Sequence, residues 1–220
     1  MITSDTKRTS HLMIGSINLR HLSNYGKLEN VISEMEKENL DVLILVDTKW
    51  KKEVRMQYDE VHVLIGNGKP AKNKGICAGV GAIVKKNVNI LNMEIVNERI
   101  THISIKTGRY VQNIIGIYAP TEDYPENDID LFYEELGKVL KRSMKMETKN
   151  GKRILKNYPV IIGDWNARVG TVKIKGIHGG HYLHKEISNN GQRLLDFSME
   201  HRLSILNTFY KRKRNKRYTW

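Results

Sequence analysis

Residues Tyr158–Gly170, with the sequence YPVIIGDWNARVG, decide the fold. The β-branched run Val160–Ile162 is typical of a buried strand. Asp164 and Asn166 follow it within a few residues, so they stand at the carboxyl end of the predicted strand, where α/β sheets bind ligands. Asp and Asn are also frequent turn formers, and for this motif taken alone a turn is the favoured explanation.

Working outward from this stretch, three more predicted strands end on a polar residue. These strands are His11–Asn18 (HLMIGSIN), Asp41–Asp47 (DVLILVD) and Val111–Tyr118 (VQNIIGIY). The run ending at Asp47 is almost wholly apolar, as expected of a strand covered on both faces. The sequence therefore places Asn18, Asp47 and Tyr118 in positions comparable to that of Asp164.

The remaining pattern predicts helices, loops and one more strand. Apolar residues at helical spacing predict helices over Lys27–Leu40, over Asp128–Leu140 with Asn127 or Asp128 as cap, and up to His201 from a cap at Asn189 or Asn190. We expect Gly66–Gly79 to be a loop, Lys141–Lys156 to be a basic insertion outside the core, and Val80–Val84 and Leu203–Asn207 to be strands. Strand, helix and strand in succession indicate a parallel crossover. No repeat or linker divides the pattern, so residues 1–220 are expected to form a single α/β domain.

The composition limits the classes of partner. The chain has 37 Lys and Arg against 24 Asp and Glu, a net charge of +13, which favours a polyanionic partner such as nucleic acid. Its single cysteine allows no intrachain disulfide, as is usual in a reducing compartment. The start lacks the apolar core of a secretory signal, and no apolar run is long enough for a bilayer. We expect a nuclear or cytoplasmic protein without a membrane partner, in an oligomeric state that the sequence does not fix.

The polar strand ends supply the groups that metal-assisted phosphodiester hydrolysis needs. One carboxylate holds a hard divalent cation, a second holds or deprotonates water, amides orient the water, and a phenol steadies a phosphate oxygen. Three histidines at equal spacing, His178, His181 and His184, also invite a zinc interpretation. Gly179 and Gly180 break the helix that would align them, and no cysteine or carboxylate pair completes such a site, so zinc is disfavoured.

Six ordered segments carry a family resemblance: SINLRHL with GKLENVISEM, DVLILVDTKW, ERITHISIKTGRYVQNIIGIYAPT, VIIGDWNARVG, NNGQRLLDF and ILNTFYKRKRNKRYTW. Together they resemble the endonuclease/exonuclease/phosphatase superfamily, and within it the apurinic-type endonuclease domain of non-LTR retrotransposons and the retroelement-derived craniofacial development protein 2-like proteins. The resemblance implies two mixed β-sheets packed as a sandwich and flanked by helices, four layers in all. It also implies Mg²⁺ or Mn²⁺ as cofactor and DNA as partner.

The resemblance implies a role for each matched residue. Asn18 and Asp47 are the implied metal-site residues, and Tyr118 the implied support of the phosphate in the transition state. Asp164 and Asn166 are the implied pair that places the attacking water. Thr219 is implied to lie near the DNA backbone, and Arg20, Lys49 and Arg168 flank the matched motifs as candidate phosphate contacts.

Two departures from the family pattern bear on activity. The family places glutamate where this chain has Asp47, and the shorter side chain predicts weaker binding of a cation that needs bonds of about 2.1 Å. The family's later Asp and its terminal Asp-His pair have no counterpart before Trp220. We therefore expect a domain that is incomplete at its C-terminus, with an exposed sheet edge.

Two hypotheses of function follow, and a third is weaker. The first is a metal-dependent endonuclease domain of retroelement origin that hydrolyses DNA, its activity impaired by these departures. The alternative is a catalytically inactive remnant that binds nucleic acid or protein through the same scaffold. A phosphatase or phospholipase shares the Asp164 and Asn166 chemistry, but the GKLEN and YTW segments argue against it.

Aromatic and basic side chains add secondary signals. Trp50 and Trp165 stand beside strand ends, where packing is a more frequent role for an aromatic residue than stacking on bases. The segment Lys211–Arg217 (KRKRNKR) is equally consistent with phosphate binding, a nuclear address and a solvated hairpin.

Overall fold

The computed structural model describes residues 11–22, 24–71, 75–108, 110–145, 148–149, 152–153, 155–156 and 158–213. These residues group into two compact units. The first unit contains the described chain up to Ile117 and then Lys138–Gly163, and the second contains Tyr118–Gly137 and the chain from Asp164 onward. Both large sheets belong to the first unit, apart from Tyr118 and Asp164, the last residues of β10 and β14.

The first sheet has five strands in the order β1-β2-β7-β4-β3. Its strands are β1 (Ile14–Asn18), β2 (Val42–Val46), β3 (Val54–Tyr58), β4 (Val61–Ile65) and β7 (Val80–Lys85). β1 and β2 run parallel, with α1 (Tyr25–Lys37) between them in the chain, and the other pairs are antiparallel. The predicted parallel crossover is thus confirmed.

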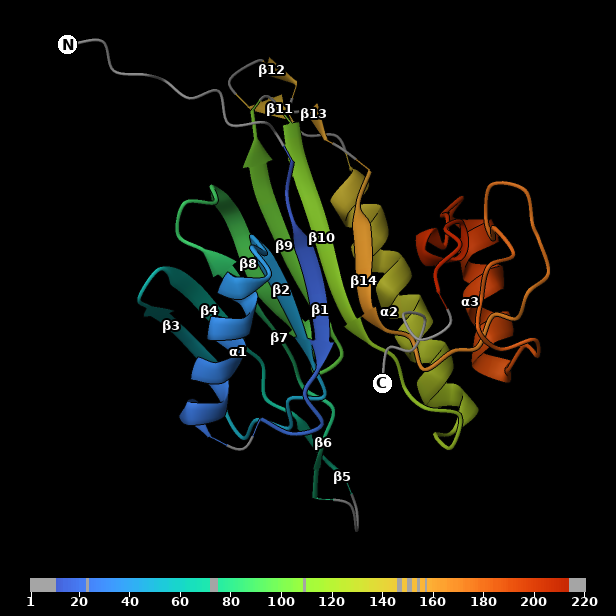
Figure 1. Ribbon diagram of the computed structural model, residues 1–220, viewed down its shortest axis with the longest axis horizontal. Helices are drawn as coiled ribbons and strands as arrows, with labels where there is room; N and C mark the ends of the chain where they lie inside the picture. The colour runs from blue at the N-terminus through green and yellow to red at the C-terminus, as the bar shows by residue number, and fades with distance from the viewer. Residues whose placement is uncertain are drawn as a thin grey trace. The chain divides into compact units, whose positions relative to one another are not determined.

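Helix α1 covers one face of this sheet (Figure 1). It begins after Asn24, whose side chain accepts a hydrogen bond from the Lys27 backbone N–H at 2.9 Å. Its buried stripe packs against alternate residues of β2, β4 and β7, as expected for an amphipathic helix on a sheet. The stripe consists of Leu28, Val31, Ile32 and Met35.

The second sheet has the order β13-β10-β9-β8, with β14 also paired to β10. Its strands are β8 (Ile90–Asn97), β9 (Ile100–Thr107), β10 (Tyr110–Tyr118), β13 (Leu155–Lys156) and β14 (Val160–Asp164). It is mixed, because β13 runs parallel to β10 and β9 antiparallel to it. Two small hairpins stand apart, β5 (Lys69–Ala71) with β6 (Gly75–Cys77) and β11 (Thr148–Lys149) with β12 (Lys152–Arg153).

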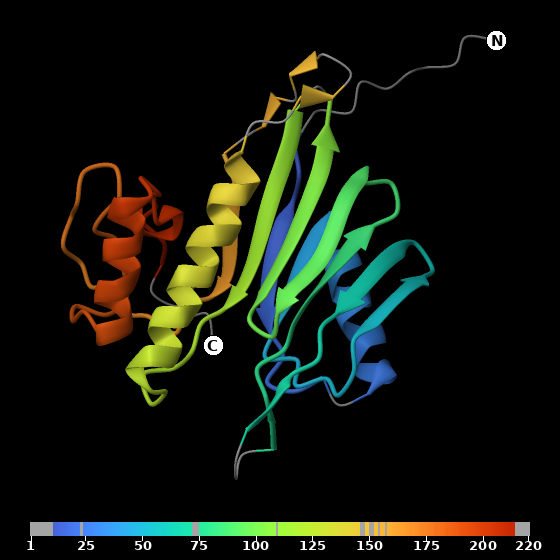
Figure 2. The same cartoon turned by 180° about the vertical axis from the view of Figure 1, so that it is seen from behind.

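The two sheets lie face to face within the first unit (Figure 2). They approach closely at Gly116 of β10, where an added Cβ would lie 2.6 Å from Ile44 Cγ2 of the first sheet and 2.6 Å from Thr101 Cγ2. Ile44 is fully buried, so no side chain larger than a hydrogen fits at residue 116 without separating the sheets. The predicted sandwich of two mixed sheets is confirmed.

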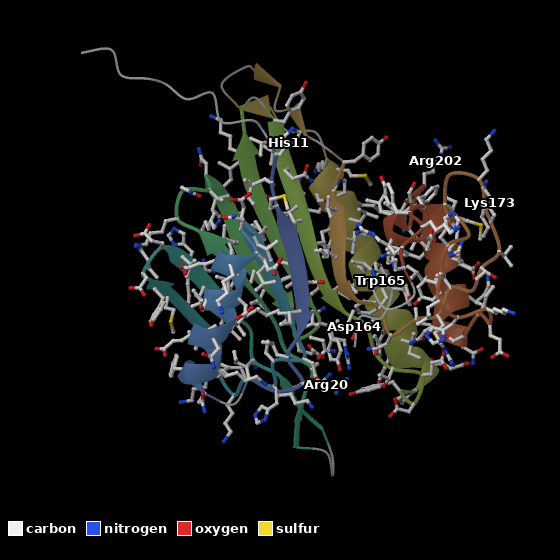
Figure 3. All side chains as sticks on the ribbon, viewed as in Figure 1. His11, Arg20, Asp164, Trp165, Lys173 and Arg202 are labelled. Atoms are coloured by element: carbon white, nitrogen blue, oxygen red, sulfur yellow. The ribbon has the colours of Figure 1, made fainter. Side chains whose placement is uncertain are left out.

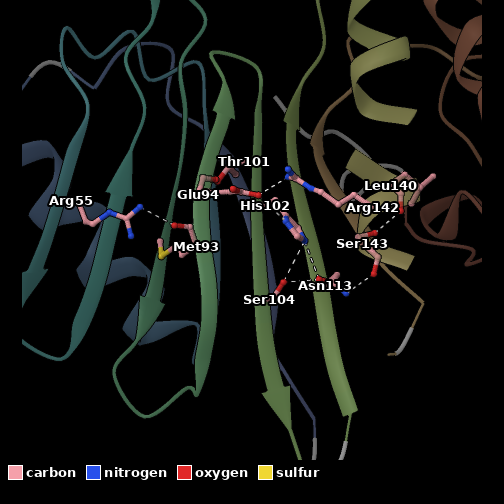
Figure 4. A network of polar contacts seen from close by, with 10 residues as sticks. All are labelled: Arg55, Met93, Glu94, Thr101, His102, Ser104, Asn113, Leu140, Arg142 and Ser143. Carbon is pink, nitrogen blue, oxygen red and sulfur yellow. Dashed lines mark hydrogen bonds and ion pairs between the residues drawn. The ribbon is translucent and has the colours of Figure 1, made fainter. Parts of the chain in front are cut away.

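The outer face of the second sheet carries a polar network (Figure 4). His102 is buried, with Nδ1 3.2 Å from Glu94 Oε1 and Nε2 3.0 Å from Asn113 Oδ1. Asn113 Oδ1 also accepts the Ser104 hydroxyl at 2.7 Å, and its Nδ2 donates to the Ser143 carbonyl at 3.1 Å. Ser143 belongs to the C-terminal part of α2 (Glu126–Met144), so the network fastens this part of the helix to β9 and β10.

Several local predictions were wrong. The segment Lys141–Lys156 is not wholly an insertion, because α2 continues to Met144 and buries Ser143. The predicted loop Gly66–Gly79 contains β5 and β6. Leu203–Asn207 is no strand, since Ile205 forms only one bridge, to His178, before the short helix η1 (Leu206–Thr208).

The predicted helix caps also differ. α2 begins at Glu126, so Asn127 and Asp128 lie within its first turn. α3 (Asn189–Glu200) is capped by Ser188, whose hydroxyl accepts the Gly191 N–H at 3.2 Å. Asn189 and Asn190 are equally good caps by residue type, but the Asn190 side chain bonds to distant backbone groups instead.

Candidate active site

The first unit brings Asn18 and Asp47 to the same sheet edge. Asn18 is the last residue of β1 and pairs with Val46, the last residue of β2, so Asp47 follows on the neighbouring strand. Two backbone hydrogen bonds continue this pairing beyond the strands, from His21 N to Asp47 O at 2.9 Å and from Leu22 N to Thr48 O at 2.8 Å. The segments that carry Asn18 and Asp47 are therefore fixed to each other.

The backbone around these two residues is strained. Nine non-glycine residues of the described chain have positive φ, and five of them lie in the joined segments at this edge. The five are Arg20 (φ 48°), His21 (104°), Asp47 (53°), Lys49 (50°) and Ala78 (59°). Residues with a Cβ rarely adopt this conformation, and such strain concentrates at ligand-binding and catalytic sites.

Charged groups surround the Asp47 carboxylate. Asp47 is buried, and Lys49 Nζ lies 3.5 Å from its Oδ2. The Asn18 side chain accepts the Arg20 backbone N–H at 3.0 Å, which fixes the direction of its Oδ1. Lys27 donates from Nζ to the carbonyl oxygens of Leu19 at 2.8 Å and His21 at 2.5 Å, pinning the turn that follows Asn18. Arg20 is exposed, as a phosphate contact requires (Figure 3).

The second unit brings together Tyr118, Asp164 and Asn166. The Ala119 N–H donates to the Asp164 carbonyl at 2.9 Å, so the ends of β10 and β14 are neighbours. Asn166 donates its backbone N–H to Asp164 Oδ1 at 2.9 Å and its Nδ2 to the Ala119 carbonyl at 2.8 Å. Asn166 adopts the left-handed conformation, with φ 45°, which asparagine tolerates better than most residues. Figure 3 marks Asp164 and Trp165 at the end of β14.

Asn190 is a supporting residue that the sequence-based assignment missed. Its buried side chain donates to the carbonyl oxygens of Pro120 at 2.9 Å and Asn166 at 3.1 Å. Its backbone N–H donates to Glu122 Oε1 at 3.0 Å, and this bond is the main reason that the pKa of Glu122 is lowered. Asn190 thus ties the start of α3 to the backbone around the Asn166 pair. Asn190 lies in NNGQRLLDF, one of the segments that carry the family resemblance, but the resemblance assigned no role to it.

The other predicted site residues have mixed outcomes. Arg168 is exposed next to the second group, and its backbone exchanges hydrogen bonds with Ser188. Thr219 lies outside the described residues. Trp165 packs against Tyr133 and Phe197, with ring centroids 6.4 Å apart in each pair, which favours a packing role. Burial of the Tyr133 hydroxyl in this cluster raises its pKa.

The three loop histidines do not form a cluster. His178 is fully buried, and its Nδ1 accepts the Gly180 N–H at 3.0 Å while burial lowers its pKa. His184 packs against the ring of Tyr182, with centroids 6.0 Å apart. Among the described residues there is no group of three or more His, Cys, Asp and Glu side chains that could hold a metal ion. His178 is instead a structural residue of its loop.

Solved structures share this arrangement of strands. The endonuclease domain of TRAS1, a telomere-specific non-LTR retrotransposon, aligns with 86% of this chain and 70% of its own at a TM-score of 0.54 and 16% identity. An AP endonuclease from Archaeoglobus fulgidus aligns with 87% of this chain and 71% of its own at 0.51 and 16%. The chain has the endonuclease/exonuclease/phosphatase fold. The predicted fold class is confirmed.

Two curated proteins are similar to this chain in sequence. Craniofacial development protein 2 from Bos taurus is 32% identical over 209 residues, and the protein from Tragulus javanicus gives the same identity over the same length. These alignments cover 94% of this chain, but the chain spans only about a third of either relative's length. The predicted homology is confirmed, although no family model matches. No helix in the described part of the chain is long and apolar enough to cross a membrane.

Proposed function

We propose that this chain is a divalent-metal-dependent endonuclease domain of retroelement origin that hydrolyses DNA phosphodiester bonds. The observation that carries the proposal is the Asp164 and Asn166 pair, locked by hydrogen bonds beside Tyr118 at the end of β14. A rigid carboxylate and amide can hold a water molecule in one orientation without reorganisation during the reaction. The basic balance of the chain, +13, supports a polyanionic substrate.

Each residue of the second group has a defined task in this reaction. Asp164 accepts a proton from the attacking water while the water oxygen bonds to phosphorus. The opposite P–O ester bond breaks, and its oxygen leaves with the bonding electrons and takes a proton from solvent. Asn166 holds the Asp164 carboxylate in place through its backbone N–H. The Tyr118 phenol donates to a non-bridging phosphate oxygen as negative charge grows there.

The first group fits a divalent cation that prefers oxygen. Asp47 offers a carboxylate and Asn18 an amide oxygen on adjoining strands, and Mg²⁺ commonly uses one or two protein oxygens and completes its shell with water and phosphate. The bound ion would supply charge that stabilises the phosphate and the leaving oxygen. Convergence of Asn18, Asp47, Tyr118 and Asp164 on one pocket stays a prediction from the sequence.

Nicking of supercoiled plasmid in Mg²⁺ or Mn²⁺ tests the proposal. The decisive variant is Asp164→Asn, which keeps the shape and removes the proton acceptor, so we expect nicking to fall by about 10²- to 10⁴-fold. Asp196→Asn on the exposed face of α3 is the matched control and should nick like the wild type. Equal nicking by the Asp164→Asn and wild-type proteins would refute the catalytic role.

A catalytically inactive nucleic-acid-binding or protein-binding remnant is the second candidate. The Lys49 ammonium, 3.5 Å from the Asp47 carboxylate, favours it, because a lysine at this distance competes with a divalent cation for the same oxygens. This candidate predicts salt-sensitive DNA binding in EDTA, without cleavage in Mg²⁺ or Mn²⁺. Metal-dependent nicking that disappears in Asp164→Asn would exclude it.

A further inference from the structure

An aromatic pair lies beside the first group of site residues, within the first unit. The rings of Tyr25 and Trp50 meet edge to face, with centroids 5.4 Å apart and an angle of 77° between planes. Tyr25 is the first residue of α1, and Trp50 stands three residues after Asp47. Three residues of chain span at most about 10 Å, so the pair lies within one or two side-chain lengths of Asp47.

The two aromatic rings differ in exposure. Trp50 is half-buried and packs against the core beneath α1, and its carbonyl accepts the Gly68 N–H at 2.8 Å. Tyr25 continues the apolar stripe of α1 by one turn, three residues before Leu28, yet it is 54% exposed. The core holds Trp50 in place, and Trp50 contacts the solvent-exposed ring of Tyr25.

Cationic residues lie close to this pair in the sequence. Arg20 precedes Tyr25 in the chain, and Lys51 and Lys52 follow Trp50, all three exposed. Backbone hydrogen bonds from His21 and Leu22 to the Asp47 and Thr48 carbonyls hold the two segments together. Aromatic rings interleaved with cations are the arrangement by which proteins bind unpaired nucleic acid, with bases stacked on rings and phosphates held by Lys and Arg.

We propose that Tyr25 and Trp50 form a stacking platform for an unpaired nucleobase of the substrate strand. The inference rests on the proposed function, which supplies the phosphate next to Asn18 and Asp47. The base of a nucleotide close to that phosphate stacks on the exposed ring of Tyr25. Trp50 fixes the orientation of this ring through the edge-to-face contact. The platform therefore favours DNA that is single-stranded, or locally opened, at the site of attack.

Binding to single-stranded and duplex DNA in EDTA tests the platform without cleavage. The probe is a fluorescent oligothymidylate of about 12 nucleotides, followed by anisotropy, with a blunt duplex of the same length for comparison. Tyr25→Ala should weaken binding to the single strand by about 5- to 100-fold, and should weaken binding to the duplex much less. Tyr25→Phe should keep the affinity within about twofold, because the ring rather than the hydroxyl stacks.

The matched control is Tyr158→Ala, an 82% exposed tyrosine of the same unit, which should bind like the wild type. The salt dependence of Tyr25→Ala should keep the wild-type slope, since no phosphate contact is lost. The platform is refuted if Tyr25→Ala binds normally, if Tyr25→Phe loses as much, if both DNA forms lose equally, or if the wild type binds neither form.

Nicking separates this inference from the proposed function. Wild-type protein that binds the single strand through Tyr25 but nicks no plasmid would keep the platform and remove the enzyme. Nicking by the wild type with unchanged single-strand affinity in Tyr25→Ala would keep the enzyme and remove the platform.

Discussion

The side-chain amide of Asn166 donates to the carbonyl oxygen of Ala119 at 2.8 Å, although 47 residues separate them in the chain. This bond joins the turn after β14 to the segment after β10, and so holds Asp164 beside Tyr118. Its partner is a backbone group, so it depends on the identity of residue 166 alone. It also explains how a left-handed residue with φ 45° persists there.

Substitution of Asn166 separates the side chain from the backbone conformation. Asn166→Gly keeps the left-handed backbone and loses the hydrogen bond, so the free energy of unfolding should fall by about 1 kcal/mol. Asn166→Ala loses the bond and also strains the backbone, at a further cost of about 1–2 kcal/mol. Urea denaturation measures both variants. An alanine variant as stable as the glycine variant would contradict the strain assigned to this position.

Gly163 sets the distance between β14 and β10. An added Cβ would lie 2.0 Å from the Ile117 carbonyl oxygen, and Gly163 has φ 145°. Gly163→Ala should therefore push the strands apart, lower the free energy of unfolding by about 3 kcal/mol and reduce nicking by displacing Asp164. Gly108→Ala is the control: it also has positive φ, 58°, but nothing within 4 Å, and should cost only about 1 kcal/mol. Thermal melting compares them, and equal losses would show that contact with Ile117 is unimportant.

Asn113 is the centre of the buried network on the second sheet. Asn113→Ala removes the acceptor shared by His102 and Ser104 and the donor to the Ser143 carbonyl. Loss of this partner for His102 Nε2, the Ser104 hydroxyl and the Ser143 carbonyl should lower the free energy of unfolding by about 2–4 kcal/mol. Lys106→Ala, at an exposed position on β9, should change it by less than about 0.5 kcal/mol. A loss under about 1 kcal/mol for Asn113→Ala would show that water replaces the missing partner.

Glu122 makes a pH-dependent contribution to the second unit. Its pKa lies below the ordinary value of 4.5, chiefly because the Asn190 N–H bonds to the ionised form. Its stabilisation is therefore full above pH 4.5 and disappears as the pH falls through the lower folded-state pKa. Because the side chain is exposed, screening limits the effect to a few tenths of a kcal/mol. The melting temperature of Glu122→Gln should lie below that of the wild type at neutral pH and meet it in acid. A difference that stays constant with pH would contradict this role of Glu122.

The length of the acid at residue 47 should control the requirement for metal. If Asp47 binds the cation, Asp47→Glu restores the missing methylene and should lower the Mg²⁺ concentration for half-maximal nicking by about tenfold. Asp47→Asn removes the charge and should raise it. Nicking of supercoiled plasmid over a series of Mg²⁺ concentrations provides the measurement. An unchanged requirement in both variants would place the metal elsewhere.

The pattern of apolar residues predicted several of the strands and the residues at their ends. The five residues of β2 are all buried, and so dense an apolar run fits only a covered strand, which is why Asp47 could be placed at its end. Asn18 was predicted to end the first strand, and it is the last residue of β1, although β1 is only partly buried. The sandwich of two sheets was predicted from the family resemblance of six segments, because periodicity alone does not show how strands are arranged in sheets.

Tertiary hydrogen bonds explain what the sequence left open. Asn190 resembles a helix cap, and only the fold shows that Pro120 and Asn166 occupy its side chain, leaving the cap to Ser188. Leu203–Asn207 has the composition of a strand, but its neighbour contributes a single bridging residue, His178. No arrangement of residues near position 190 or 205 in the chain encodes these distant partners.

The left-handed backbone at Arg20, His21, Asp47, Lys49 and Ala78 predicts which positions would be substituted first under selection for stability alone. Glycine adopts such angles freely, so selection for thermal robustness alone should convert these positions to glycine or asparagine before it touches the hydrophobic interior. Relatives that keep the scaffold without the proposed activity should therefore lose these side chains before their hydrophobic core changes.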